Sequence, residues 1–131
     1  MPVATADPPA VTAPALRRAL IAGARRVIAA RDDLNRINVF PVADGDTGSN
    51  LASTLGSVLQ GALSRRSRHI GELLVGIGND AIDGARGNSG AIMAQFLVGL
   101  AEHARNAPVL DAQTLADAVR RGADSARSAL A

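Results

Sequence analysis

Apolar residues recur at helical spacing along most of this chain. Between Pro14 and about Ile37, the apolar residues Leu16, Leu20 and Val27 share one helical face, and arginines lie opposite them. Similar stripes predict four further helices: Ser49 to Leu63, Ile70 to Ala85, one from near Ser89 through Ile92, Phe96 and Leu100, and one after Asp111 through Leu115, Val119 and Leu130. No stretch alternates convincingly with the period of two that marks a strand. The pattern therefore predicts an all-α chain of about five helices.

The apolar stripes are narrow and rich in alanine and glycine, which favours closely packed antiparallel helices. Short connections between long helices make neighbours run up and down. The loops "NVFPVADGDTG" and "GARGNSG" then share one end of the bundle, and "SRRSRH" and "NAPVL" share the other. Each glycine-rich loop leads into a helix, so both present unpaired backbone N–H groups and the positive end of a helix dipole to the same region.

Length and composition add the cellular setting. The chain has 131 residues and no cysteine, which fits one domain in a reducing cytoplasm. Residues 1–13 are rich in proline and alanine and lack the pattern of a signal peptide, so they are expected to form a disordered tail before a domain at 14–131. The apolar run "AIMAQFLVGLA" is too short to span a bilayer.

Charge and aromatic content argue against nucleic acid as a partner. The 14 basic residues are all arginine and face 12 acidic ones, so the net charge is only +2. The aromatic residues are Phe40 and Phe96, too few for a base-stacking platform.

The first glycine-rich loop holds two carboxylates, Asp44 and Asp46, two positions apart. Such carboxylates repel each other unless a cation lies between them, and glycines at 45 and 48 allow the tight turn that this needs. Hard oxygen ligands too few to form a complete cage suit magnesium, which completes its shell with water and phosphate oxygens. A calcium EF-hand fits less well, because Ser49 and Leu55 occupy the positions that require glycine and glutamate.

The second loop would supply phosphate contacts. Backbone amides of Gly87 to Gly90 and the hydroxyl of Ser89 can hold phosphate oxygens without adding repulsive charge. Simpler interpretations stay open for each motif alone: "DGD" is a common surface turn, and Asn88 or Ser89 is an ordinary N-cap. The location of both loops at one end of a bundle is what favours phosphate and metal binding.

The two motifs carry a family resemblance. "LNRINVFPVADGDTGSNLAST" and, about forty residues later, "GARGNSGAIMAQFLVG" resemble the DhaL-type nucleotide-binding domain of bacterial dihydroxyacetone kinases, and most closely the kinase domain of bacterial fatty acid kinases. The resemblance covers roughly residues 14–131. It implies a closed barrel of antiparallel amphipathic helices that binds ATP at one end through a pair of magnesium ions held by carboxylates.

The resemblance also implies roles for individual residues. Asp44 and Asp46 match the metal-binding carboxylates, and Asn38 lies near a position where dihydroxyacetone kinases have a further aspartate. The helix-entry residues below the phosphates are matched by Thr47, Gly48, Ser49 and Asn50, and the phosphate-covering loop by Gly87, Asn88, Ser89 and Gly90. Ala43, Ser49 and Leu51 depart from the family's usual proline, threonine and methionine.

Three further residues have two interpretations each. Arg86 either neutralises charge on a transferring phosphoryl group or forms a salt bridge at a helix end. His103 is expected to be a packed or helix-terminal residue rather than a ligand. His69 belongs to a basic turn at the far end, which is either a solvated turn or a docking point for an acidic partner.

The resulting prediction is an ATP- and magnesium-dependent kinase domain of the fatty acid kinase type, acting on an acyl group carried by a separate fatty-acid-binding protein. The alternatives are a dihydroxyacetone kinase subunit that binds ADP, or a non-catalytic fragment that binds nucleotide or acts as a helical interaction module. The family's domain extends further than this sequence, so the resemblance implies a partial barrel. Apolar side chains on the outer helices should then stay partly uncovered and favour self-association: Leu16, Leu20, Leu115, Val119 and Leu130.

Overall fold

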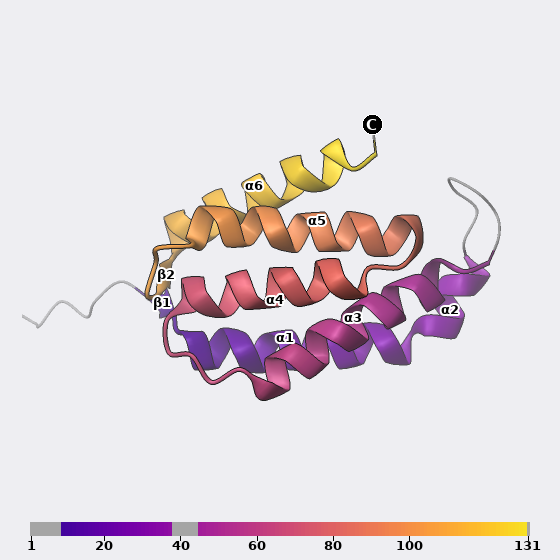
Figure 1. Ribbon diagram of the computed structural model, residues 1–131, viewed down its shortest axis with the longest axis horizontal. Coiled ribbons are helices and arrows are strands. Elements are labelled where there is room, and N and C mark those ends of the chain that lie inside the picture. Colours follow the sequence, from indigo (N-terminus) through magenta and orange to yellow (C-terminus); the bar gives the residue numbers. More distant parts are fainter. Residues whose placement is uncertain (1–8, 38–44, 131) are drawn as a thin grey trace, which may run out of the picture.

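The structure, a computed structural model, describes residues 9–37 and 45–130. Within these ranges the chain forms six helices and one pair of very short strands (Figure 1). In chain order they are β1 (Ala10–Val11), α1 (Ala13–Ala29), α2 (Arg31–Arg36), α3 (Thr47–Ser64), α4 (Ile70–Gly84), α5 (Gly87–Ala104), β2 (Leu110–Asp111) and α6 (Ala112–Ser128). The long helices pack as a bundle, which confirms the all-α prediction.

The first predicted helix is in fact two helices. α1 ends at Ala29, and the backbone N–H of Ala30 donates to the carbonyls of Arg26 and Val27 at 3.2 and 3.0 Å. α2 then begins with Asp32 and Asp33 in its first turn, where negative charge stabilises the positive end of a helix dipole. The prediction of one helix to Ile37 was therefore wrong, and these two acids were the local signal for a new helix start.

A two-residue antiparallel pairing joins the start of α1 to the start of α6. Ala10 pairs with Asp111, and Val11 pairs with Leu110. Leu110 is buried, and Val11 packs against the core. The expected tail at residues 1–13 overlaps these elements, because Ala10 and Val11 form β1, Thr12 is the N-cap of α1, and Ala13 begins that helix.

The core lies where α3, α4 and α5 meet. α4 contributes the most large buried side chains, Ile70, Leu73, Leu74 and Ile77, and it contacts both α3 and α5. Burial of this many aliphatic groups is the main stabilising contribution that the bundle has. In the described part of the chain, no helix is long and apolar enough to cross a membrane.

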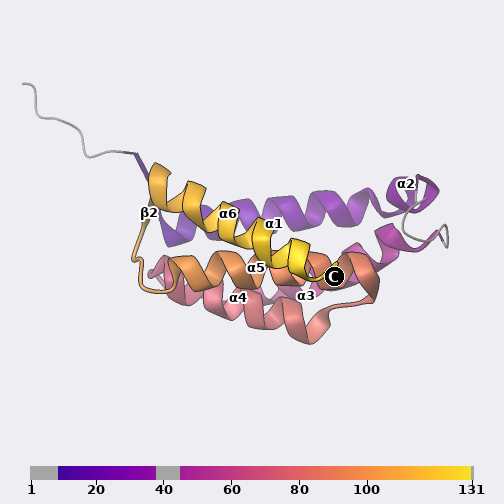
Figure 2. The same ribbon diagram turned by 90° about the horizontal axis from the view of Figure 1, so that it is seen from above.

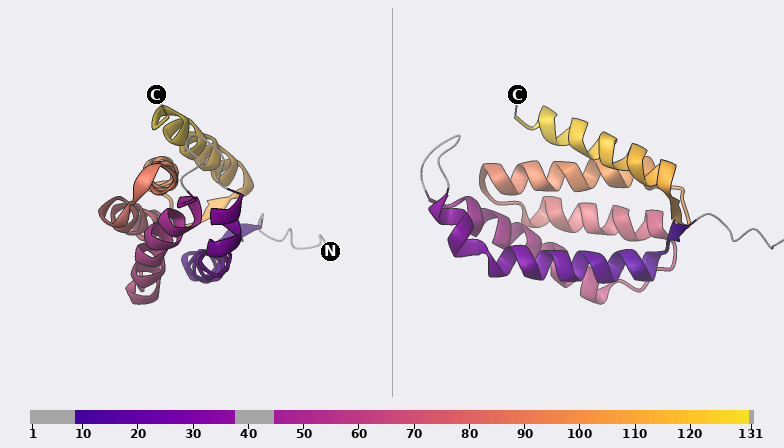
Figure 3. Two further views of the ribbon diagram at one scale, coloured as in Figure 1. Left: turned by 90° about the vertical axis from the view of Figure 1, so that its right-hand side faces the viewer. Right: turned by 180° about the vertical axis from the view of Figure 1, so that it is seen from behind.

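The outer helices each have one main partner. α1 packs on α3, and α6 runs along α5 (Figure 2). The left view of Figure 3, taken along the helices, shows α6 and α1 apart from each other. The side chains expected to stay uncovered do so: Leu16, Leu20 and Leu115 are half-buried, and Val119 and Leu130 are 42% and 65% exposed.

The loops gather at the two ends of the bundle as predicted. At one end, the backbone N–H groups of Ile70 and Gly71 donate to the carbonyls of Pro108 and Ala107 at 3.1 and 2.9 Å. The turn from Arg65 to His69 therefore lies beside the α5–β2 connection. The helices α3 and α5 begin at the opposite end, remote from this turn (Figure 1).

Candidate functional site

The N-termini of α3 and α5 meet at one end of the bundle. The Ser89 hydroxyl, in the first turn of α5, donates a 3.0 Å hydrogen bond to the backbone carbonyl of Thr47, the first residue of α3. The predicted adjacency of the two motifs is thus confirmed for their described parts. Asp44 and Asn38, two of the three expected metal ligands, lie outside the described residues.

Glycine is required where the second motif turns into α5. Gly87 has a φ of +64°, and a Cβ at this position would also overlap the side-chain amide of Asn50 on α3. A residue with a side chain would be strained there on both counts. Asn50, expected at the helix entry, therefore lies directly against Gly87 of the second motif.

The short helix α2 braces the start of α3. The side-chain oxygen of Asn35 accepts a 3.0 Å hydrogen bond from the backbone N–H of Ser49, and the Asn35 side-chain NH₂ donates to the Ser49 hydroxyl, also at 3.0 Å. A Cβ on Gly48 would overlap the backbone carbonyl of Arg31. Gly48 is therefore needed for the packing of α2 on α3. Asn35 was missed from sequence, because an asparagine on a polar helix face carries no distinguishing signal.

The start of α5 leaves backbone donors available. No side chain caps this helix, and in the described residues the amides of Gly87, Asn88 and Ser89 have no hydrogen-bond acceptor. Gly90 differs from the prediction: its N–H donates to the carbonyl of Arg86 at 3.1 Å, within the first helical turn. The set of amides that can meet a phosphate therefore ends at Ser89.

The Ser89 hydroxyl also differs from the prediction. Its single hydrogen is donated to the Thr47 carbonyl, so it cannot at the same time be donated to a phosphate oxygen. In this arrangement Ser89 joins the two motifs, and its backbone amide is the group left for a ligand.

Arg86 and Asp46 stand at the same end. Arg86 is exposed, and its guanidinium forms no ion pair with any described residue, so the alternative of a helix-end salt bridge is not found. Asp46 is the N-cap residue of α3 and is exposed. Across residues 9–37 and 45–130, no three acidic, histidine or cysteine side chains cluster as a metal site, so a magnesium site here depends on residues such as Asp44.

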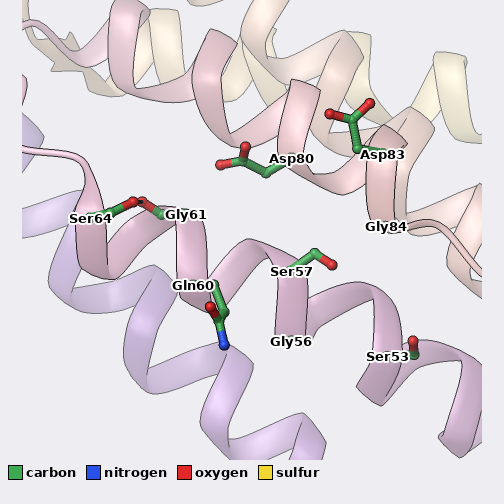
Figure 4. A pocket seen from close by; sticks show the side chains of 9 residues that line it. All are labelled: Ser53, Gly56, Ser57, Gln60, Gly61, Ser64, Asp80, Asp83 and Gly84. Atoms are coloured by element: carbon green, nitrogen blue, oxygen red, sulfur yellow. Dashed lines mark hydrogen bonds between the residues drawn. The ribbon is translucent and has the colours of Figure 1, made fainter.

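The described residues also line an open groove away from the first turns of α3 and α5. It encloses about 660 Å³ between α3 and α4, and Figure 4 shows Asp80 and Asp83 on one side and Ser57 and Gln60 on the other. Of the two quoted motifs, Ser53 and Gly84 line it, whereas Asp46 and the glycine-rich segments 47–50 and 87–90 do not. Asp80 is already bound by the Arg65 guanidinium, with N–O distances of 2.9 and 3.0 Å.

The two histidines lie in structural positions. His69 caps α4, because its Nδ1 accepts a 3.2 Å hydrogen bond from the backbone N–H of Glu72. His103 is exposed in the last turn of α5, a position that suits a cation at a helix end.

Comparison with known proteins is consistent with this geometry. Residues 41–131 match the family model described as the DAK2 domain. Uncharacterized proteins of Staphylococcus saprophyticus, Staphylococcus haemolyticus and Staphylococcus aureus are 33%, 35% and 32% identical to the chain over 111 residues. That alignment covers 85% of this chain and 20% of each relative, so the chain spans about a fifth of the length of these relatives.

DAK2 domains bind ADP or ATP with magnesium. The matched region contains the second glycine-rich motif, the first motif from Pro41 onward, and all the helices from α3 onward. The chain therefore belongs to the DAK2 domain family, the ATP-binding domain of the DhaL/glycerone kinase family.

Proposed function

We propose that this chain is the nucleotide-binding part of a kinase of the fatty acid kinase type. It binds MgATP at the end of the bundle where α3 and α5 begin. The γ-phosphoryl group is transferred to the carboxylate of a fatty acid that is carried by a separate binding protein.

One observation supports this proposal most directly. The first three amides of α5, at Gly87, Asn88 and Ser89, have no acceptor in the described residues, and Ser89 is bonded to the start of α3 beside Asp46. Free amides at a helix N-terminus favour a phosphate, and a carboxylate alongside favours the metal that accompanies it. A nucleotide phosphate with magnesium has the charges that suit both groups.

The donor set fits magnesium in its chemistry. Asp46, with Asp44 and Asn38, would offer hard oxygen ligands, and the bound ion would neutralise part of the triphosphate charge. The amides of Gly87 to Ser89 would hold phosphate oxygens. The Arg86 side chain, at the N-cap of α5 and without an ion pair to any described residue, would balance the charge that develops on the phosphoryl group during transfer.

The phosphoryl acceptor is proposed from the amino-acid sequence of the first motif. "NVFPVADGDTG" resembles fatty acid kinases more than dihydroxyacetone kinases. In the proposed reaction, an oxygen of the fatty acid carboxylate attacks the γ-phosphorus, the bond from phosphorus to the β–γ bridging oxygen breaks, and ADP leaves with the bond electrons. The products are an acyl phosphate and ADP.

Calorimetric titration with ADP, with and without magnesium, tests the nucleotide site. The parent chain should bind ADP much more tightly with magnesium. Asp46→Asn and Asp44→Asn should each remove most of this gain, while Asp83→Asn, an exposed carboxylate on α4, should leave it unchanged. Equal MgADP binding by all four proteins would contradict the metal assignment.

The acceptor is tested by an assay for the phosphorylated product. Hydroxylamine trapping should detect an acyl phosphate when ATP, magnesium and a fatty acid on its binding protein are present. Phosphorylation of dihydroxyacetone without acyl phosphate would favour the glycerone kinase alternative instead.

The 131-residue chain should self-associate in solution. Val119 on α6 and Leu130, which follows that helix, are both exposed apolar side chains. A monodisperse monomer by light scattering would contradict this expectation.

A further inference from the structure

One buried hydroxyl connects the two glycine-rich motifs from below. Thr54 is fully buried in α3, and it is the one polar side chain that reaches this level of burial in residues 9–37 and 45–130. It lies about two helical turns after Thr47, where α3 begins. A hydroxyl in such a place requires hydrogen-bond partners, since a buried polar group without them is costly.

The Thr54 hydroxyl both donates and accepts a hydrogen bond. Its Oγ1 donates to the carbonyl of Asn50 at 2.8 Å, which fixes where its hydrogen points. The same atom accepts a 3.1 Å hydrogen bond from the backbone N–H of Arg86, 32 residues later in the chain. The donated bond is a local helix contact, so the accepted bond is the one that joins α3 to the second motif.

The Arg86 bond comes just before the turn that starts α5. Arg86 is extended, with φ −132° and ψ 131°, and Gly87 follows with a positive φ. Gly90, one turn into α5, packs against Thr54 so closely that a Cβ on it would overlap Oγ1. Thr54 therefore touches the backbone both immediately before and immediately after the three free amides.

We propose that Thr54 is a positioning residue for the nucleotide site. Its hydroxyl holds the Arg86 backbone in place and thereby sets the direction in which the amides of Gly87, Asn88 and Ser89 point. This inference rests on the proposed nucleotide binding. It assigns to Thr54 no contact with the nucleotide itself.

Two pairs of variants isolate the hydroxyl. Thr54→Val replaces it by a methyl group of similar size, so Arg86 loses its acceptor. Thr54→Ala and Thr54→Ser are both smaller than threonine and differ from each other only by the hydroxyl, which keeps the test valid if valine disturbs the fold. Val58→Ala, one turn further along α3 and buried, is the control for a general loss of packing.

The experiment measures MgADP affinity by calorimetry and the exchange rate of the Arg86 amide hydrogen by NMR, both well below the unfolding temperature. Thr54→Val and Thr54→Ala should bind MgADP about tenfold more weakly, as expected for one lost buried hydrogen bond, and Arg86 should exchange faster. Thr54→Ser should restore both values, and Val58→Ala should leave both near the parent's.

Parent-like affinity in Thr54→Ala, or equal weakening in Thr54→Ser and Thr54→Ala, would overturn the proposal. If the parent itself does not bind MgADP, the proposed function fails and the positioning role fails with it. The Arg86 exchange rates separate these cases, because they report whether the hydroxyl holds the backbone regardless of any ligand.

Discussion

The helices α4 and α5 begin at opposite ends of the bundle, and their first turns differ in one respect. The first three amides of α4 all have acceptors: Ile70 donates to Pro108, Gly71 donates to Ala107, and Glu72 donates to His69. The first three amides of α5 have none in the described part of the chain. The start of α4 is therefore called the closed end, because the protein's own groups accept its first amides. The start of α5 is called the open end, because no described group accepts its first amides.

The closed end is also reinforced by other groups. The Arg17 side chain donates to the carbonyls of Ala62 and Leu63 near the end of α3, at 2.6 and 3.1 Å. At the open end, the polar links of Asn35, Thr54 and Ser89 hold the backbones together, and the first three amides of α5 keep no acceptor among the described residues. The difference fits our proposal, in which the closed end serves stability and the open end binds the nucleotide.

The largest expected effect comes from exchanging glycine for alanine at each helix start. A Cβ on Gly71 would overlap the backbone carbonyls of Ala104 and Arg105, so Gly71→Ala should cost about 1–3 kcal/mol in the free energy of unfolding. Gly87→Ala, strained by its positive φ, should mainly reduce MgADP affinity. Urea unfolding and calorimetric titration measure the two quantities.

Gly23 provides the control for both variants. It lies in α1 with open space around it, so Gly23→Ala should stabilise the chain slightly and leave nucleotide binding unchanged. Loss of nucleotide affinity in Gly71→Ala, measured on folded protein, would break the division between the two ends.

Ser89→Ala should have the next largest effect. It removes the hydrogen bond to the Thr47 carbonyl that joins the motifs, so MgADP binding should weaken by about 1 kcal/mol. Ser128→Ala, which removes a hydrogen bond of the same kind near the end of α6, should leave the affinity unchanged. Equal MgADP affinity in Ser89→Ala and the parent would show that the Ser89 hydroxyl does not contribute to nucleotide binding.

The ion pair of Arg65 and Asp80 should matter less. The Asp80 carboxylate raises the pKa of Arg65, chiefly through its hydrogen bond, but the two side chains are 37% and 23% exposed. Solvent screening therefore limits the loss in Asp80→Asn to about 1 kcal/mol of unfolding free energy. Asp83→Asn, on the same helix and without an ion pair to any described residue, should cost less. A larger loss in Asp83→Asn than in Asp80→Asn would contradict a stabilising role for the Arg65–Asp80 pair.

The smallest expected effect concerns pH. The backbone N–H of Thr114, 2.8 Å from the Asp111 carboxylate, holds the pKa of Asp111 below its usual range. The folded state is thus favoured where Asp111 is ionised. This stabilisation of the folded state is fully present above about pH 4 and is lost as the pH falls through the lowered pKa of Asp111.

Asp111→Asn keeps a capping oxygen but removes the charge. Its melting temperature should therefore fall less than that of the parent between about pH 5 and about pH 3. Asp117→Asn, in the same helix, is the comparison variant. Parallel melting curves for the parent and Asp111→Asn over this range would show that the cap makes no pH-dependent contribution.

The sequence predicted the fold and the meeting of the motifs because both follow from helix periodicity and connection length. Alternate loops of an up-and-down bundle share an end, which placed Thr47 near Ser89 without any knowledge of side chains. The break at Ala30 was missed, since the apolar stripe continues through it.

The finer assignments depended on hydrogen-bond partners that spacing does not reveal. A threonine within an apolar stripe gives no sign that it will accept a bond from Arg86. Likewise, the Gly90 amide could not be excluded as a phosphate donor until the position of the Arg86 carbonyl was known. Residue identity predicted the available chemistry, and the three-dimensional arrangement decided which groups were already used.

The pairing of β1 with β2 has a consequence for how this chain folds. It joins residues about one hundred positions apart, so it is a contact of very high sequence separation. On a ribosome, α1 can form early, but the strand ahead of it has no partner until Leu110 and Asp111 have been synthesised. Closing so long a loop has an entropic cost, and the two residue pairs of β1 and β2 offset little of it. We therefore expect β1 to dock late, after α3, α4 and α5 have assembled the core. The strand that is synthesised first would then be among the last elements to reach its folded position.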